Sequence, residues 1–213
     1  MSKRIVYILL GMPGCGKETF GLLLAERILG KTGTLPFISD TGKLFRASLS
    51  NESGAPILNG FHQARIKEIQ NSGKLQTSAL ATIMWGQHFC KNYNNEEYII
   101  IDGSPRRSEE FDVMNQFLKE FYDADIRYIH IIVSDATAVI RMLLRNEKNP
   151  RPETSSKELI QVRLDDFKKH NQPVITKIRL SAPASHFLTV SNDGTPDDLK
   201  GSTHDYFFKF NEK

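Results

Sequence analysis

Short, continuously apolar runs alternate with amphipathic stretches along the chain. The first run, residues 5–10, is rich in β-branched side chains and ends at Gly11, which is typical of a strand buried on both faces. Similar runs follow at residues 35–38, 98–101, 128–133 and 187–190. The stretches between them show helical periodicity, over residues 17–29, 57–71, 77–93, 109–121, 136–145, 155–179 and 196–208.

This alternation predicts an α/β fold, because each pair of parallel strands needs a crossover, usually a helix. We expect a three-layer sandwich in which helices cover both faces of a five-stranded parallel sheet. Two segments do not fit a plain sandwich, the helical excursion 41–77 and the polar, proline-containing stretch 146–156. They are expected to be insertions in a single domain spanning residues 1–213, the simpler alternative being a surface elaboration and an ordinary loop.

The composition agrees with one globular domain. Of the 213 residues, 39% are hydrophobic and 25% are charged, which excludes wholesale disorder, a collagen-like chain and a membrane bundle. The net charge of +3 is too small to indicate a nucleic-acid partner, but it suits a small anionic ligand.

Cysteine usage and hydropathy suggest the compartment. Cys15 and Cys90 are the only cysteines, too few for a disulfide framework, which favours a reducing environment. No apolar run approaches the ~18 residues of a membrane span. We expect a protein of the cytoplasm, the alternative being an organelle matrix, that acts as a monomer with neither a membrane nor a nucleic-acid partner.

A glycine-rich turn directly follows the first strand and reads Gly11-Met12-Pro13-Gly14-Cys15-Gly16-Lys17. Glycines let the backbone approach a polyphosphate, and N–H groups at the start of the next helix bind its oxygens. Lys17 supplies a charge for the outer phosphates. The common form of this motif has Ser or Thr directly after the lysine, whereas here Glu18 precedes Thr19.

Lysine, one residue and then threonine is the pattern of the adenylate kinase family, and further motifs of that family follow in order. A Thr-Gly pair ending in arginine occupies residues 41–46, with Lys43 where an aspartate is usual. A strand ending in Asp-Gly-aromatic-Pro-Arg matches residues 99–106, with Ser104 replacing the aromatic residue. The remaining matches are Arg141, Arg145, Arg151 and the pair Arg163-Leu164. The chain therefore resembles the short-lid nucleoside monophosphate kinases over nearly its whole length.

The resemblance implies a P-loop NTPase fold and transfer of the γ-phosphoryl group of ATP to AMP, with Mg²⁺ accompanying ATP. Residues 41–77 would bind the acceptor nucleoside monophosphate (NMP), and residues 146–156 would form a short lid. Both segments would close over the substrates and exclude water. Because the lid has no cysteine cluster, no structural zinc is expected.

The resemblance also implies a role for each site residue. ATP would contact Gly11, Pro13, Gly14, Cys15, Gly16, Lys17, Glu18, Thr19, Arg141 and Arg145. The acceptor would contact Thr41, Gly42, Arg46, Leu75, Gly103, Arg106, Glu110, Arg151 and Arg163. The catalytic cations would be Lys17, Arg106, Arg145, Arg151 and Arg163. Asp102 would orient Mg²⁺ through water, and the Ser104–Pro105 peptide bond is expected to be cis.

Residue spacing supports part of this assignment independently. Arg141 and Arg145 lie four residues apart and share one helical face. Alone, such a pair is most simply a solvated charged face. With Arg151 and Arg163 in the family's arrangement, an anion clamp is favoured, because a planar guanidinium binds phosphate oxygens two at a time.

Several positions depart from the family pattern and leave alternatives open. Glu110 stands where a glutamine usually reads the acceptor adenine, and a carboxylate, which only accepts hydrogen bonds, suits guanine better. Alternatively, Glu110 is solvated or its helix is displaced by one residue. Gln76, Glu18 and Glu153 are further departures. The open alternatives are a kinase for GMP or a pyrimidine nucleotide, a nucleotide-binding regulator without turnover, and a kinase for nucleic acid or another small molecule.

Overall fold

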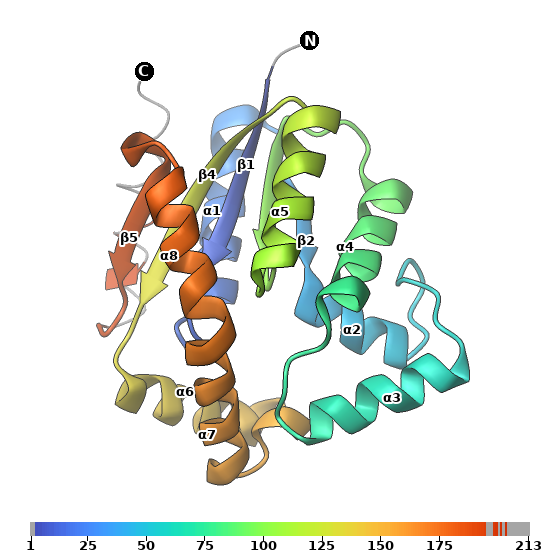
Figure 1. Ribbon diagram of the computed structural model, residues 1–213. Coiled ribbons are helices and arrows are strands. Elements are labelled where there is room, and N and C mark those ends of the chain that lie inside the picture. Colours follow the sequence, from blue (N-terminus) through green and yellow to red (C-terminus); the bar gives the residue numbers. More distant parts are fainter. Residues whose placement is uncertain (1–2, 195–197, 200, 202, 204–213) are drawn as a thin grey trace.

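The five apolar runs form the strands of one parallel sheet in the computed structural model, which describes residues 3–194, 198, 199, 201 and 203 (Figure 1). The strands are β1 (Arg4–Leu10), β2 (Phe37–Asp40), β3 (Tyr98–Asp102), β4 (Ala124–Ile132) and β5 (Phe187–Ser191). The helices are α1 (Lys17–Thr32), α2 (Thr41–Leu49), α3 (Gly60–Asn71), α4 (Ser78–Asn92), α5 (Ser108–Gln116), α6 (Asp135–Lys148), α7 (Lys157–Asp166) and α8 (Gln172–Ser181).

The described strands lie in the order β2-β3-β1-β4-β5, and each neighbouring pair is parallel. The central strand β1 pairs on both sides, with Ile8 opposite Ile101 of β3 and Tyr128 of β4. A strand that pairs on both edges and is covered on both faces has no polar side, which explains the unbroken apolar run at residues 5–10. The expected α/β class with a five-stranded parallel sheet is confirmed.

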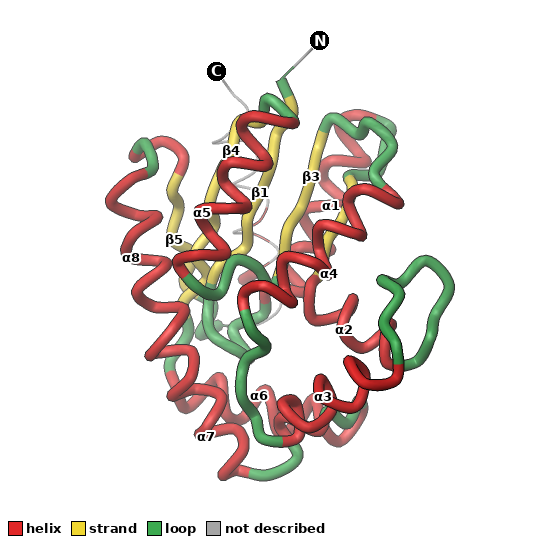
Figure 2. Tube along the Cα trace, turned by 45° about the vertical axis from the view of Figure 1, so that its right-hand side comes forward, coloured by secondary structure: helices red, strands yellow, loops and turns green. Residues whose placement is uncertain are grey.

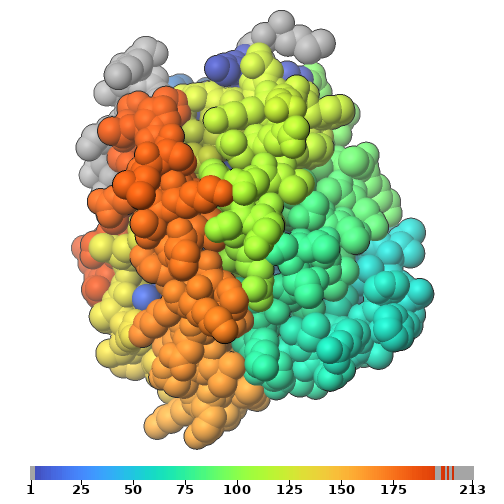
Figure 3. Space-filling view, in the orientation of Figure 1, coloured from blue at the N-terminus to red at the C-terminus, as the bar shows by residue number. Residues whose placement is uncertain are grey.

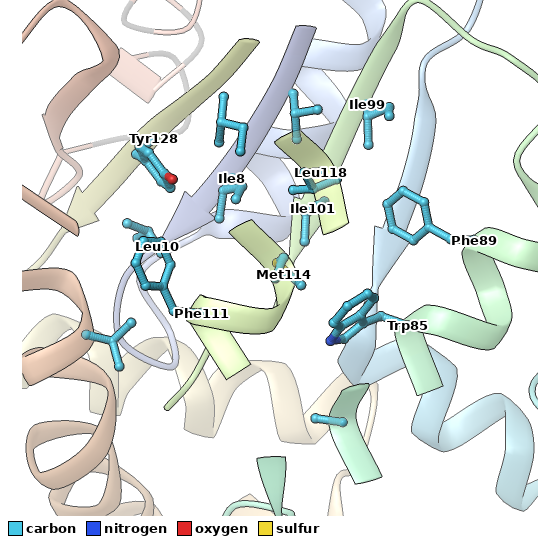
Figure 4. Packing of buried hydrophobic residues seen from close by; sticks show 14 of the residues in the cluster. Ile8, Leu10, Trp85, Phe89, Ile99, Ile101, Phe111, Met114, Leu118 and Tyr128 are labelled. Atoms are coloured by element: carbon cyan, nitrogen blue, oxygen red, sulfur yellow. The ribbon is translucent and has the colours of Figure 1, made fainter. Parts of the chain in front are cut away.

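Alternate side chains of β1 point to opposite faces of the sheet and enter two separate cores. Val6, Ile8 and Leu10 belong to the core beneath α4, α5 and α8 (Figure 4). Figure 3 shows that these three helices cover this face side by side. Tyr7 and Leu9 belong to the opposite core, with residues of α1, α6 and α7. The three layers are therefore built by the two-residue period of the strands.

Two strands differ from the sequence prediction by two residues or more. The strand predicted at 35–38 is β2, Phe37–Asp40: Leu35 is 63% exposed and takes no part in the sheet, whereas the polar Asp40 pairs with Asp102 of β3. The strand predicted at 128–133 begins earlier, because β4 pairs with β1 from Ala124 onward. Pairing with neighbours, which local hydropathy does not report, determines both boundaries.

Helix boundaries differ in a similar way. The helix predicted at 57–71 begins at Gly60, where the Asn59 side chain accepts the His62 N–H and caps it. The pattern at 155–179 becomes α7 and α8, joined by the π-helical turn Phe167–Asn171. A second π-helical turn, Phe117–Phe121, extends α5. The helix predicted at 196–208, including the aromatic residues near the C-terminus, lies largely outside the described residues.

The segments at the carboxyl ends of the strands are the ones that exceed a plain sandwich. α2 and α3 follow β2 directly, and α6 and α7 follow β4. Figures 1 and 2 both show α3, α6 and α7 at the end of the molecule toward which the strands point. In open α/β sheets this edge is where ligands bind. None of the described helices is long and apolar enough to cross a membrane.

Candidate functional site

The turn between β1 and α1 is held in a conformation that only glycine adopts readily. Gly14 and Gly16 have φ values of +82° and +92°, and a Cβ atom on Gly14 would lie 2.6 Å from the Ala138 carbonyl oxygen. The Asn192 side chain donates a hydrogen bond to the Cys15 carbonyl oxygen at 2.7 Å and ties the turn to the end of β5. The turn is therefore packed against Ala138 and Asn192 on one side. It leads directly into the N-terminus of α1, where anions bind.

Lys17 is the first residue of α1 and lies against this turn. Its ammonium group donates to the carbonyl oxygens of Gly11 at 2.7 Å and Met12 at 3.0 Å. Its side chain also lines the cavity described next. The positive charge is therefore positioned at the N-terminus of a helix, whose dipole has the same sign.

A cavity of about 480 Å³ opens above the carboxyl edge of the sheet. This volume is in the range of small-molecule sites. Among the described residues that line it are seven cations and four carboxylates. The cations are Lys17, Arg46, Arg106, Arg141, Arg145, Arg151 and Arg163, and the carboxylates are Glu18, Asp40, Asp102 and Glu153. The wall therefore has an excess of positive charge and suits an anionic ligand.

The arginines of the cavity repel one another. Burial, together with the charge of Arg106, lowers the pKa of Arg163 to about 10. Burial and then the charge of Arg151 lower the pKa of Arg145 to about 10. In the part of the chain that the structure describes, the Nε atoms of Arg145 and Arg151 are buried and have no hydrogen-bond partner. Buried donors without acceptors, on a wall where cations outnumber carboxylates, are what an anion would satisfy.

Two of the cations converge where α2 begins. The Asp40 side chain accepts the Lys43 N–H at 3.0 Å and caps α2. A Cβ atom on Gly42 would lie 3.4 Å from Arg46 Nη1 and 3.9 Å from Arg106 Nη2, so the small residue leaves both guanidinium groups accessible. The Nε of Arg106 donates to the Gly103 carbonyl oxygen at 2.6 Å, which fixes the direction of the side chain.

The segment after α6 is organised around one amide. The Asn146 side chain accepts hydrogen bonds from the Arg151 N–H at 3.2 Å and the Thr154 hydroxyl at 2.9 Å, and it donates to the Thr154 carbonyl oxygen. Thr154 in turn accepts a hydrogen bond from Arg145 Nη2 at 3.0 Å. A single side chain therefore brings Arg145 and Arg151 together across the turn.

Glu18, Lys43 and Arg151 form a contact between three segments, which we call the charged junction. Glu18 of α1 pairs with Lys43 of α2 at 2.8 Å and with Arg151 at 3.5 Å. The Lys43 and Glu18 side chains are 52% and 45% exposed. Partial burial acts to raise the pKa of Glu18, but Lys43, Arg151 and Arg46 together lower it below its ordinary value. The junction thus links the start of α1 to α2 and to the segment after α6.

Asp102 and Asp40 end neighbouring strands and lie opposite each other in the register. Burial raises the pKa of Asp102 to about 6; Lys17 opposes this shift and Asp40 adds to it. Two such carboxylates suit a hard cation that keeps several of its waters, as Mg²⁺ does. No cluster of three or more metal-ligating side chains occurs among the described residues.

Most of the site residues predicted from the sequence line this one cavity. Three do not: Cys15, Thr41 and Glu110 are all buried, at 0%, 2% and 1% exposure, and none is part of its wall. The alternative in which Glu110 is solvated is therefore wrong, since Glu110 is 1% exposed. Leu75 lies on the wall, and its N–H donates to Asp166 at 2.7 Å. The Ser104–Pro105 peptide bond is cis, as expected.

Sequence reasoning missed Asp40 and Asn171. Asp40 lies beyond the apolar run that predicts the strand, which ends at residue 38. Its position directly before the Thr-Gly pair is the sequence signal that could identify it. Asn171 lines the cavity from the π-helical turn, and its Oδ1 is buried without a hydrogen-bond partner among the described residues. No local pattern distinguishes this asparagine from those on a helix surface.

Comparison with known proteins agrees with this geometry. The family model described as "AAA domain" matches residues 10–161. The adenylate kinase of Corynebacterium diphtheriae is 27% identical over 196 residues, covering 92% of this chain and 95% of that protein. The adenylate kinase of Prochlorococcus marinus is 29% identical, with 82% and 84% covered, and that of Oenococcus oeni is 27% identical, with 84% and 85% covered.

Proposed function

The chain belongs to the AAA domain family and to the adenylate kinases, and from that premise we propose that it transfers the γ-phosphoryl group of ATP to AMP, giving two molecules of ADP. The enzyme is a phosphotransferase of the nucleoside monophosphate kinase type. The observation that carries this proposal is the set of seven cations on the wall of one cavity beside the phosphate-binding turn.

Phosphoryl transfer between two nucleotides explains why so many cations are needed. Donor and acceptor are both polyanions and repel each other. The protein contributes little covalent chemistry to such a reaction, so its rate depends on positioning and charge neutralisation. A protein that only binds one nucleotide would not need seven cations along the wall of one cavity.

The ATP half of the site comprises the turn and the elements behind it. We assign the ATP phosphates to the turn 11–16, with Lys17 at the β- and γ-phosphates and Thr19 at the phosphates behind them. Arg141 lies on α6 and donates to the Gly194 carbonyl oxygen at 3.1 Å, which places it at the outer rim, suited to the ATP base.

The acceptor half comprises residues 41–77, which we propose as the NMP-binding segment. Arg46 and Arg106 flank Gly42 and would bind the phosphate of the acceptor, with Leu75 against its base. An acceptor phosphate is largely ionised near neutral pH, so no general base is required.

Arg145, Arg151 and Arg163 would surround the phosphoryl group during transfer. Residues 146–156 are proposed to be the lid, because the hydrogen bonds of Asn146 give this short segment its shape and bring two of the three arginines together. The mutual repulsion of these arginines in the free protein would be relieved when negative charge enters between them.

We propose that Mg²⁺ accompanies ATP. When bound, the ion would neutralise charge on the phosphate oxygens. Asp102, with Asp40 beside it, would hold the ion through water; the donor set is all oxygen, which suits this ion. We further propose that the enzyme acts as a monomer in the cytoplasm.

The test is ADP formation from ATP and AMP, followed across a panel of GMP, CMP and UMP, with ATP binding measured beside turnover. We expect turnover with AMP, and Lys17→Ala should abolish it. Lys31→Ala, at the far end of the same helix, is the matched control. Binding of ATP without turnover on any acceptor would instead identify a nucleotide-binding regulator.

A further inference from the structure

Two departures from the family pattern, Ser104 and Glu110, meet in the fold. The Ser104 hydroxyl donates a hydrogen bond to Glu110 Oε1 at 2.5 Å. Glu110 Oε2 accepts the backbone N–H of Arg106 at 2.8 Å. Ser104 is 2% exposed and Glu110 is 1% exposed. Both oxygens of the carboxylate are therefore used inside the protein.

The contact extends to the acceptor-binding segment. The Thr41 and Ser104 hydroxyl oxygens are 2.8 Å apart. Because the single Ser104 proton goes to the carboxylate, Thr41 must be the donor in this pair. Thr41 is the first residue of α2 and is 2% exposed. We call Thr41, Ser104, Glu110 and the Arg106 backbone the buried corner.

The buried corner fixes Arg106 at both ends. Glu110 accepts its backbone N–H, and the Gly103 carbonyl oxygen accepts its Nε–H. Its Nη2 is thereby directed toward Gly42, beside Arg46. A displacement of the backbone at Arg106 would move the guanidinium away from the place where the acceptor phosphate is proposed to bind.

The same geometry separates Glu110 from the acceptor base. A base-reading side chain must present a free polar atom to the cavity, yet Glu110 is not part of the cavity wall and both its oxygens already have donors. Breaking these contacts to reach a base would leave the Arg106 N–H unpaired and would remove the acceptor of the Ser104 hydroxyl, and each lost partner carries a penalty.

We infer that Glu110 is a positioning residue for Arg106 and α2 and does not read the acceptor base. This inference rests on the proposed function. Glu110 then affects acceptor affinity only by positioning Arg106, which is proposed to bind the acceptor phosphate. Other residues of the cavity wall determine the preference among purine monophosphates.

The test uses Glu110→Ala, Glu110→Gln and Ser104→Ala, with the exposed neighbour Glu109→Gln as control. Steady-state rates are measured with ATP against AMP and GMP. Glu110→Ala should raise KM for AMP about tenfold, equivalent to one lost buried hydrogen bond, with KM for ATP changed less than about twofold. Ser104→Ala should raise KM for AMP less, because it spares the contact with Arg106. Glu109→Gln should behave as the native enzyme.

Glu110→Gln separates positioning from base recognition. Its carbonyl oxygen can still accept the Arg106 N–H, and its amide can donate to Ser104, whose hydroxyl then turns toward Thr41. We expect near-native KM values and an unchanged AMP-to-GMP ratio of kcat/KM. A shift of that ratio by about tenfold or more in this variant would show that residue 110 contacts the base and would overturn the inference. An unchanged KM for AMP in Glu110→Ala would overturn it as well.

Two measurements keep this result distinct from failure of the proposed function. Native turnover tests the function by itself. Calorimetry measures the affinity of native protein and of the variants for AMP, and so reports phosphate binding by Arg106 without catalysis. Thermal unfolding confirms that each variant is folded. If native protein binds AMP but does not turn over, a weaker affinity in Glu110→Ala still supports the positioning role, and an equal affinity contradicts it.

Discussion

The buried corner and the charged junction each place one glutamate beside cations of the same site, but the two surroundings differ. Glu110 is 1% exposed, and short hydrogen bonds engage both of its oxygens. The Glu18 side chain is 45% exposed and makes ion pairs at 2.8 Å with Lys43, which is 52% exposed, and at 3.5 Å with Arg151, which is 14% exposed. Both glutamates replace a residue that is usual in the family.

The contrast between Glu110 and Glu18 follows from burial, which determines the role of a carboxylate. A buried, fully hydrogen-bonded carboxylate has a structural role, because removing it leaves buried donors without an acceptor. An exposed ion pair is weak, because water and salt compete for both charges. Glu110 should therefore affect the positions of Arg106 and α2. Glu18 should affect only the balance of charge in the site before substrates bind.

Arg151→Ala should have the largest effect of the variants considered, because Arg151 belongs both to the charged junction and to the cavity wall. We expect kcat to fall by roughly 100-fold, since Arg151 is one of the proposed donors to the transferred phosphoryl group. The free energy of unfolding should change by less than about 1 kcal/mol, since the ion pair with Glu18 is weak. Steady-state kinetics and urea unfolding measure the two effects.

Lys43→Ala is the matched control for Arg151→Ala. It removes the other partner of Glu18 without removing a cation from the cavity wall. We expect kcat to stay within about twofold of native, as for a weak surface pair. Equal losses in the two variants would mean that the junction, and not the cavity arginine, is required for turnover.

Glu110→Ala tests the buried corner by stability. Loss of the carboxylate leaves the Arg106 N–H without its acceptor, so the free energy of unfolding should fall by about 1–3 kcal/mol. Glu109→Ala, which is exposed on the same helix, should change it by less than about 0.5 kcal/mol. The midpoint of urea unfolding should shift at constant m-value. A loss as small as that of the control would remove the distinction between the two glutamates.

The pH dependence of stability should have opposite signs at the two glutamates. Burial, against the hydrogen bonds of Ser104 and Arg106, raises the pKa of Glu110 above its ordinary 4.5. The folded state then holds the proton more tightly, so this contribution is complete below about pH 4.5 and is lost as pH rises through the raised pKa. For Glu18, whose pKa is lowered, the contribution is present above its ordinary 4.5 and is lost as pH falls through the lowered value.

Urea unfolding of native protein, Glu110→Gln and Glu18→Gln from pH 3.5 to 8 checks these signs. The stability of native protein relative to Glu110→Gln should decline as pH rises, and its stability relative to Glu18→Gln should decline as pH falls. Two curves with the same slope would show that burial does not separate the two sites.

Salt gives the smallest expected effect. Glu18→Gln should cost about 0.2–1 kcal/mol of unfolding free energy at low ionic strength. Most of that cost should vanish in 1 M NaCl, where the screening length falls to about 3 Å. The cost of Glu110→Ala should persist in the same salt, because buried hydrogen bonds are not screened. If the loss of unfolding free energy in Glu18→Gln did not depend on salt, Glu18 would have a structural role like that of Glu110.

Local pattern was most reliable where an element is buried on both faces. The central strand β1 and its glycine-rich turn could be predicted nearly residue by residue, because burial makes the pattern continuous and the turn needs glycine. The edge strand β2 could not, since its last residue, Asp40, is polar and is placed in the strand by pairing with β3. Each cation of the cavity could be predicted by motif, yet none of the motifs reports distances between them.

The order of strands and helices, the glycine-rich turn and the identity of the seven cations can be predicted from the sequence, because these depend on periodicity and on residue type at fixed local spacing. The side that Glu110 faces depends on tertiary packing, since its partner Ser104 also contacts Thr41, 63 positions earlier in the chain, where β2 pairs with β3. The tertiary structure likewise decides that Glu18 joins α2 to residue 151, a contact across 133 positions. Burial and long-range proximity belong to the folded chain, and they determine what a glutamate at a given position does.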